Sequence, residues 1–477
     1  MSRSAFLQSI CFSTMLPGVT APMELVGDWA GALQTPLGQL HLVVRLTRGA
    51  DGAYTGGIDS PDQGVTNIPI SAVSITGTTV TLTVEGIHGS FTGTLSADGK
   101  TLTGTWQQGS STLPLTLQQG AEAPAPRRPQ MPLPPFPYQS VDISFSNPDA
   151  PGVTLAGTLT MPPGKGPFPA VVLIAGSGPH DRDETLFGHK PFLVIADALT
   201  RQGIAVLRYD KRGTEQSTGD YAQATTDDFA GDALAAVQAL RARQEIDPAH
   251  IGLIGHSEGG IIAPLAATKS PAVAFIILLA GTGIPGDQLL LLQGDKINQA
   301  LGKSAAEITQ QHQALEQCYA LVRQEREPEK LAAALRDTIT RTIANLPEEA
   351  RTKLGDLQQF TETQVKALAS PWMRRFLTYD PAPTLANVSC PVLALNGERD
   401  TQVPHQENLS AIAAALAKSA AAGRTVDFTV QSLPGLNHLF QSCKTGAPTE
   451  YATVEETIAP QVLEIMEAWI TAHVRKE

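Results

Sequence analysis

The stretch IGLIGHSEGG, residues 251–260, decides how the second part of this chain is interpreted. Its first residues form a short apolar run typical of a buried strand, and the residues after it have a helical pattern. Between the two, Gly255-His256-Ser257-Glu258-Gly259 matches G-x-S-x-G, a strand-to-helix turn that displays a reactive serine, where a Cβ at either glycine would crowd the turn. A Gly/Ser-rich loop is the alternative, because a chain with 42 glycines in 477 residues can contain so loose a pattern by accident.

Composition limits the classes of function. The length of 477 residues and the 42% hydrophobic content suit a soluble globular protein with more than one domain. The net charge of −12 argues against nucleic acid as a partner, because no basic stretch could neutralise phosphates. Four scattered cysteines suit neither a disulfide framework nor a thiolate zinc site. The sequence lacks an uninterrupted run of about 18 apolar residues, so we do not expect an integral membrane protein.

Residues 1–21 share some features with a secretory signal. Arg3 precedes a moderately apolar stretch, and Val19-Thr20-Ala21 is the kind of small-residue sequence at which signals are cleaved. The polar Gln8 and Ser9 depart from that pattern. A periplasmic or secreted location and a cytoplasmic one therefore both stay open.

Residues 22–120 have the pattern of an all-β domain. Apolar residues alternate along short segments, as at Val80, Leu82 and Val84, and stretches such as SADGK at 96–100 supply turns. This spacing predicts a small antiparallel barrel or sandwich. Nothing in it resembles a set of catalytic residues, and we consider ligand binding, covering of the second domain and homodimer formation as its roles.

A proline-rich linker follows at residues 121–138. Seven prolines lie between Pro124 and Pro137. Proline fixes φ and has no N–H to donate, so this segment is predicted to be an extended, semi-rigid spacer. It marks the boundary of a second domain at residues 139–477.

The second domain alternates strand and helix patterns. After two antiparallel strands come five apolar runs, at 170–176, 204–210, 251–255, 273–281 and 391–397. These runs predict a doubly wound, mostly parallel α/β sheet that is covered by helices on both faces. Ligands bind at the carboxyl ends of such strands, and Ser257 follows one of them. The interval at about 285–378 is too long for a simple crossover and has helical signals, so it predicts a helical lid over this edge.

A serine at this position needs two partners, in the chain order serine, acid, histidine, each after a strand. Asp400 follows the predicted strand PVLALNG, with Glu398 as the second choice, and His438 follows the predicted strand TVDFTVQSL. A solvated loop acid and an ordinary packed histidine are the alternatives at these two positions. We predict that Ser257, Asp400 and His438 form a catalytic triad.

An oxyanion hole is the fourth requirement, because backbone N–H groups must stabilise the charge on a tetrahedral intermediate. One donor is predicted to be the amide of Glu258, which follows the nucleophile directly. The other is predicted to be the amide of Ser177, with Gly176 and Gly178 lining the substrate site in the loop AGSGPHDRDE. A flexible glycine turn is the alternative, and a metal site there is less favoured because no second histidine cluster stands at ligand spacing.

From about Val141 onward, the chain resembles the lid-bearing bacterial carboxylesterases of the α/β-hydrolase superfamily. The matching segments are AGSGPHDRDE, LRYDKRGTEQSTGD, GHSEGG, NGERDTQVP and LPGLNHLF. The resemblance implies an esterase with the Ser257, Asp400, His438 triad and without a cofactor. Residues 22–120 look like the lipocalin-like β domains that precede some secreted bacterial hydrolases.

These observations predict a serine carboxylesterase that acts on small-molecule esters of short to medium acyl chain through an acyl-enzyme. A serine peptidase and an acyl thioesterase are the alternatives on the same fold, because the triad also cleaves amides and thioesters. A catalytically inert protein that binds the cell envelope or carbohydrate is the alternative from another class.

Overall fold

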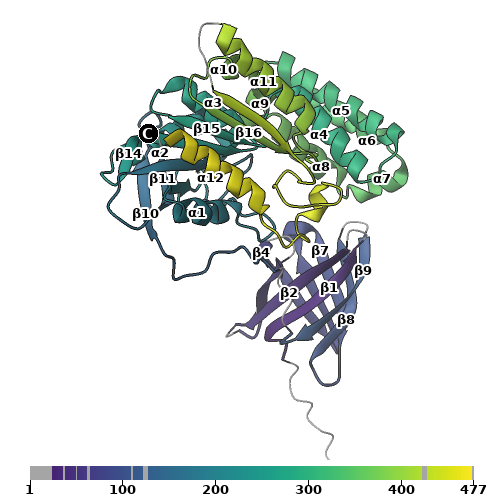
Figure 1. The fold of residues 1–477 in the computed structure, drawn as a ribbon. Coiled ribbons are helices and arrows are strands. Elements are labelled where there is room, and N and C mark those ends of the chain that lie inside the picture. Colours follow the sequence, from purple (N-terminus) through teal and green to yellow (C-terminus); the bar gives the residue numbers. More distant parts are fainter. Residues whose placement is uncertain are drawn as a thin grey trace, which may run out of the picture. The chain divides into compact units, whose positions relative to one another are not determined.

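The computed structural model describes residues 24–35, 38–49, 51–61, 65–108, 111–121, 127–421 and 427–474, and residues 1–21, which share features with a secretory signal, lie outside them. The described residues form two compact units. One contains the strands between residues 27 and 119, and the other extends from residue 127 onward (Figure 1).

The first unit is a nine-stranded sheet in the order β4-β3-β2-β1-β9-β8-β7-β6-β5. Its strands are β1 (Gly27–Thr35), β2 (Gly38–Arg48), β3 (Tyr54–Ser60), β4 (Val65–Pro69), β5 (Ala72–Thr76), β6 (Thr79–Val84), β7 (Gly89–Leu95), β8 (Thr101–Gln108) and β9 (Ser111–Gln119). Val80, Leu82 and Val84 point into one core together with Trp29 and Phe91. The predicted antiparallel all-β domain is confirmed, as one sheet curled into a half-barrel (Figure 1).

The second unit is built on an eight-stranded sheet in the order β10-β11-β13-β12-β14-β15-β16-β17. Its strands are β10 (Gln139–Ser146), β11 (Thr154–Met161), β12 (Phe168–Ile174), β13 (Ala205–Tyr209), β14 (Ile246–His256), β15 (Phe275–Leu279), β16 (Val392–Gly397) and β17 (Phe428–Leu433). β10 and β11 pair antiparallel, and the strands from β13 to β17 pair parallel. The predicted doubly wound sheet with two antiparallel strands is therefore confirmed.

Helices cover both faces of this sheet. They are α1 (Pro191–Arg201), α2 (Thr226–Arg241), α3 (Gly259–Lys269), α10 (Ala382–Leu385), α11 (His405–Ala421) and α12 (Pro460–Val474). In β12, Val172 packs into the core that α2, α3 and α11 share, whereas Val171 and Leu173 pack into the core that α1 and α12 share. This burial on both sides is why the parallel strands are continuous apolar runs.

The C-terminal helix begins later than the sequence pattern indicates. We expect it from about Val454, but α12 begins at Pro460. The preceding residues form a loop, in which the amide of Thr457 donates to the side chain of Gln130 at 2.6 Å. Proline is well suited to the first turn of a helix, and this tertiary contact holds the residues before it in a non-helical path.

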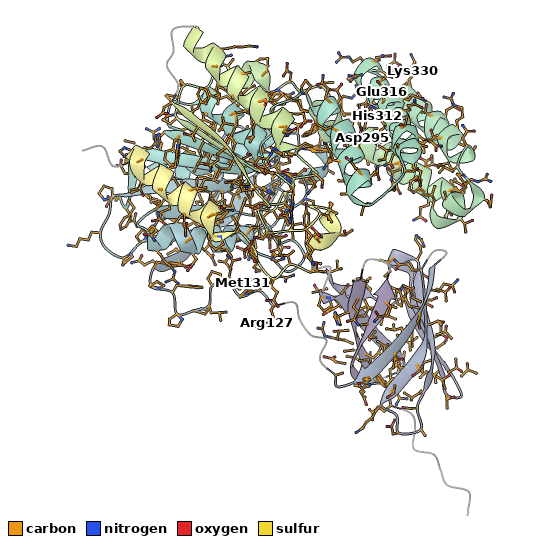
Figure 2. All side chains as sticks on the ribbon, turned by 45° about the vertical axis from the view of Figure 1, so that its right-hand side comes forward. Arg127, Met131, Asp295, His312, Glu316 and Lys330 are labelled. Carbon is orange, nitrogen blue, oxygen red and sulfur yellow. The ribbon has the colours of Figure 1, made fainter. Side chains whose placement is uncertain are left out.

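The insertion that follows β15 and precedes α10 contains α4 (Gly286–Ala300), α5 (Ala305–Gln324), α6 (Pro328–Ala344), α7 (Glu348–Lys353), α8 (Leu357–Leu368) and α9 (Pro371–Leu377). Proline suits the first turn of a helix, and α6 and α9 begin at a proline while Pro347 precedes α7. Residues of α4, α5, α6, α8 and α9 form an apolar core that is separate from the cores of the sheet. Figure 2 labels Asp295 on α4 and His312 on α5, whose Oδ2 and Nδ1 atoms lie 2.8 Å apart. No helix among the described residues has the length and apolar character needed to cross a membrane.

Residues 127–138 of the predicted linker belong to the second unit. The Arg128 guanidinium donates to the carbonyls of Phe187 at 2.8 Å and Ala452 at 3.0 Å, and Gln130 bonds to the backbone near the start of α12. Figure 2 labels Arg127 and Met131 of this segment. Side-chain hydrogen bonds thus fix this stretch, although its prolines cannot donate from the backbone.

Candidate active site

Ser257 occupies a sharp turn between β14 and α3. Its φ of +53° lies in the left-handed region, which costs a non-glycine residue about 1–2 kcal/mol. Its amide donates to the carbonyl of Leu279 at 2.9 Å, and its carbonyl accepts from the amide of Gly260 at 2.9 Å. The turn is held from the neighbouring strand and from the first turn of α3, so the strained conformation is fixed by its surroundings.

The glycines of this turn allow close approach of backbone. A Cβ on Gly255 would lie 2.0 Å from the carbonyl oxygen of Gly259, and one on Gly259 would lie 2.2 Å from the carbonyl oxygen of Ile174. Backbone atoms cannot move aside as the end of a flexible side chain can. The prediction that a Cβ would crowd the turn at these two glycines is confirmed.

Gly259→Ala is expected to destabilise the fold by about 2 kcal/mol, because the added methyl group overlaps a backbone oxygen and overpacking has costs of this size. The measurement is urea denaturation followed by circular dichroism. Gly294→Ala, in α4, is the matched control, since its Cβ would meet only Leu315 Cδ1 at 3.7 Å. The free energy of unfolding of the control should rise by up to about 1 kcal/mol, because alanine has a higher helix propensity than glycine. A Gly259→Ala protein as stable as this control would contradict the packing of the turn.

Asp400 and His438 come from the two strands beyond β15. Asp400 follows β16 and His438 follows β17, and their side chains are 0% and 5% exposed. His438 Nδ1 and Asp400 Oδ2 lie 2.8 Å apart. The other carboxylate oxygen of Asp400 accepts from the amides of Gln402 and Val403, each at 2.8 Å. The structure thus brings together two predicted site residues that are 38 positions apart.

The imidazole of His438 is oriented for use as a base. With Nδ1–H donated to Asp400, the lone pair of the neutral ring lies on Nε2. The backbone of His438 is tied to the serine turn, because its carbonyl accepts from His256 Nε2 at 3.0 Å. In the described part of the chain, the Ser257 hydroxyl makes no hydrogen bond to the His438 ring. Such bonds are often long in a free enzyme and shorten when the substrate binds.

Glu184 and His256 form a second buried pair that sequence reasoning missed. His256 Nδ1 lies 3.0 Å from Glu184 Oε1, with side-chain exposures of 8% and 2%. Burial opposes charging of both groups, but the opposite charge and the hydrogen bond outweigh it, so the pKa of His256 is raised and the pKa of Glu184 is lowered. The His256 and His438 rings lie 4.8 Å apart. The motif G-x-S-x-G leaves the residue before the serine unspecified, so it could not signal this role.

Glu184→Gln is expected to lower the free energy of unfolding by about 3 kcal/mol near pH 5.5, because it breaks a buried ion pair. Because the pKa of His256 is raised, its contribution to stability is complete below pH 6.5 and is lost as pH rises through the raised pKa. Because the pKa of Glu184 is lowered, its contribution to stability is complete above pH 4.5. Urea denaturation from about pH 5.5 to about pH 9.5 should show the difference from wild type shrinking.

The partly exposed pair of Asp247 and His250 offers a control for this prediction. His250 Nδ1 lies 2.7 Å from Asp247 Oδ2, and both side chains are 30% exposed. Asp247→Asn should cost less than about 1 kcal/mol, as exposed pairs do. A stability difference for Glu184→Gln that is the same at every pH would rule out a charged Glu184–His256 pair.

The predicted oxyanion loop lies against the nucleophile, since a Cβ on Gly176 would be 3.1 Å from Ser257 Cβ. The amide of Gly176 donates to Glu184 Oε1 at 2.7 Å, and the amide of Gly178 donates to the Tyr221 hydroxyl at 3.0 Å. The amides of both glycines that were predicted to line the substrate site are thus hydrogen-bonded to protein side chains. Among the described residues, the amides of Ser177 and Glu258 have no hydrogen-bond partner, so these two donors are available to a substrate.

The acidic side chains that follow this loop serve other partners. Asp181 accepts a hydrogen bond from the Thr185 hydroxyl at 2.6 Å, and Asp183 pairs with Arg208. Together with Glu184, each acid of the segment therefore has a protein donor, which gives this stretch a structural role in the free protein.

A comparison with known families covers the part of the chain that contains these strand ends. The family described as serine aminopeptidase, S33, matches residues 190–441, just over half of the chain. The chain belongs to the serine aminopeptidase S33 family. Ser257, Asp400 and His438 all lie within the matched residues, whereas the oxyanion loop precedes them. Together with the similarity to an esterase described next, the family match confirms the predicted resemblance to an α/β-hydrolase.

The protein is similar to Esterase EstD of Thermotoga maritima, with 37% identity over 147 residues, which are 31% of this chain and 35% of that protein. The chain thus spans about a third of the length of this relative. Two similar solved structures are the α/β hydrolase GrgF from Penicillium sp. sh18 (17% identity, TM-score 0.41, 70% of this chain and 99% of that one) and the Pyrococcus furiosus esterase Pf2001 (14% identity, TM-score 0.40, 71% and 92%).

Proposed function

We propose that this S33 family member is a serine hydrolase that cleaves carboxylic esters. The observation that carries the proposal is the buried pair of His438 and Asp400, at 2.8 Å, at the same sheet edge as Ser257. A hydroxyl is inert near neutral pH unless a base removes its proton, and that base needs a third group to orient it. The three residues supply these roles.

The reaction follows from these positions. Ser257 Oγ attacks the ester carbonyl carbon while His438 Nε2 takes its proton, and Asp400 stabilises the imidazolium. The negative charge on the carbonyl oxygen is stabilised by the amides of Ser177 and Glu258. The C–O bond to the alcohol then breaks, His438 returns the proton to the leaving alkoxide, and water releases the acyl group by the reverse sequence of proton transfers.

The charges around the site favour an ester over an aminopeptidase substrate. An aminopeptidase must receive a free α-ammonium group, and a buried carboxylate is the group that pairs with such a cation. The carboxylates of Asp400, Glu184 and Glu258 are paired with His438, His256 and Lys211, respectively. None of these three is free for a substrate amine.

The inserted helices bear on the acyl chain. In α9, Trp372 Nε1 donates to the Glu258 carboxylate at 2.7 Å, so this helix contacts the residue next to the nucleophile. Arg375 of the same helix pairs with Asp227 of α2. We expect α4–α9 to act as a lid that limits the acyl pocket, which favours short to medium chains over long ones.

A substrate panel on the purified protein tests the proposal. We expect p-nitrophenyl butyrate to be cleaved with a higher kcat/KM than p-nitrophenyl palmitate, an aminoacyl p-nitroanilide or a medium-chain acyl-CoA. A higher kcat/KM for the anilide would assign the protein to the peptidases, consistent with the description of its family. A higher kcat/KM for the acyl-CoA would assign it to the thioesterases.

A further inference from the structure

Lys211 connects the two segments that supply the proposed oxyanion donors. Its Nζ donates to the carbonyl of Gly176 at 2.7 Å and to Glu258 Oε2 at 3.0 Å. The Lys211 and Glu258 side chains are 5% and 1% exposed. The ammonium also lies 4.1 Å from the centre of the Phe229 ring, which stabilises a cation through its π face. A buried lysine is therefore held by a carbonyl, a carboxylate and a ring.

The contact with Gly176 sets the direction of the Ser177 amide. The carbonyl of Gly176 and the N–H of Ser177 belong to one planar peptide group and point in opposite directions. A bond from Lys211 to the oxygen thus fixes where the N–H points. The positive charge on the oxygen side also polarises the group, which makes Ser177 N–H a stronger donor to an anion.

The contact with Glu258 acts on the other donor. Besides Lys211, the Glu258 carboxylate accepts from the Thr226 hydroxyl at 2.8 Å and from Trp372 Nε1 at 2.7 Å. Donors from three segments therefore hold the side chain of the residue whose own amide is the first oxyanion donor. The Lys211 side chain thus contacts the segments of both donors, through the Gly176 carbonyl and through Glu258, which is 47 positions from Lys211.

We propose that Lys211 is a positioning residue of the oxyanion hole, which holds and polarises the 176–177 peptide so that Ser177 N–H and Glu258 N–H point at one oxygen. The proposal rests on the proposed function, in which Ser257 is the nucleophile. A buried ion pair alone is weak evidence for any role. The contact with the Gly176 carbonyl carries this proposal, because it acts directly on the peptide group that bears the Ser177 N–H.

The test is the rate at which a fluorophosphonate labels the protein, because this reaction needs no knowledge of the natural substrate. Ser257 Oγ forms a bond to phosphorus, the P–F bond breaks, fluoride leaves, and the serine proton goes to His438. The phosphoryl oxygen gains negative charge and requires the oxyanion hole. Lys211→Met should lower the second-order rate constant for labelling by about 10- to 100-fold. Removal of an oxyanion donor lowers rates by about 10²- to 10³-fold, and the loss here is expected to be smaller because both amides remain.

Two further variants separate positioning from stability. Lys211→Met leaves the Glu258 charge buried and unpaired, so the double variant Lys211→Met/Glu258→Gln removes both charges and should recover the thermal stability. Its labelling rate should stay about 10-fold or more below wild type if Lys211 positions the loop. Arg212→Met is the matched control, since Arg212 pairs with Asp232 in a neighbouring buried ion pair, with Nη2–Oδ1 at 2.7 Å. Its labelling rate should be close to wild type.

Each outcome has one meaning. A double variant that recovers both stability and labelling rate would overturn the positioning role and leave Ser257 as the nucleophile. A loss of rate in Arg212→Met equal to that in Lys211→Met would overturn it as well, since any buried ion pair would then have the same effect. A wild-type protein that is not labelled at Ser257 would overturn the proposed function together with the inference.

Discussion

Ser257→Ala is expected to lower kcat for p-nitrophenyl butyrate by about 10⁵- to 10⁶-fold, because the variant has no nucleophile for the acyl-enzyme step. Substrate binding does not need the hydroxyl, so KM should change little. The measurement is steady-state hydrolysis by both proteins, purified side by side, with active-site titration to exclude traces of wild type.

Ser270→Ala is a suitable control for this substitution. Ser270 is the C-cap of α3, the helix that begins after Ser257, and its hydroxyl accepts only a weak bond from the amide of Ala272 at 3.3 Å. Its kcat should stay within about twofold of wild type, as expected for a surface substitution. If Ser257→Ala kept the activity of this control, the nucleophile would have to be another residue.

Asp400→Asn is expected to lower kcat by about 10⁴-fold near neutral pH. The shape of the side chain is retained, but an amide cannot stabilise the imidazolium and can hold His438 in the wrong tautomer, with the proton on Nε2. The change should fall on kcat, because Asp400 is buried behind the imidazole and lies 2.8 Å from Nδ1. Steady-state kinetics on p-nitrophenyl butyrate measure it.

Glu398→Gln provides the matched control, because the sequence offered Glu398 as the second choice for the acid. The Glu398 side chain accepts from the Ser432 hydroxyl at 3.0 Å in an exposed position. Activity within about twofold of wild type is expected, as for other surface changes. The reverse result, with activity lost in Glu398→Gln and kept in Asp400→Asn, would exchange the roles of the two acids.

Much of the fold could be predicted because it depends on local patterns. Apolar runs on both faces mark the parallel strands, and prolines mark where α6 and α9 begin. The rule that catalytic residues follow strand ends then selects Asp400 and His438. The alternation of residues in β6 predicts a strand with one buried face, but it could not tell a barrel or sandwich from the curled sheet that forms.

The side chains that support the site could not be predicted in this way. Glu184 and His256 are 72 positions apart, and their pairing depends on how a loop folds back against the serine turn. Gln130 likewise holds the loop before α12, which is why the helix begins at Pro460 rather than near residue 454. These contacts are set by tertiary packing, for which a single sequence has no periodic signal.

A crystal structure of the protein after reaction with a fluorophosphonate would show whether Ser257, His438 and the two amides act together. We expect phosphorus bonded to Ser257 Oγ, the phosphoryl oxygen within about 3 Å of the Ser177 and Glu258 amides, and His438 Nε2 within hydrogen-bonding distance of the serine oxygen. Phosphorus on a different residue, or an imidazole of His438 turned away from Ser257 in the adduct, would contradict it.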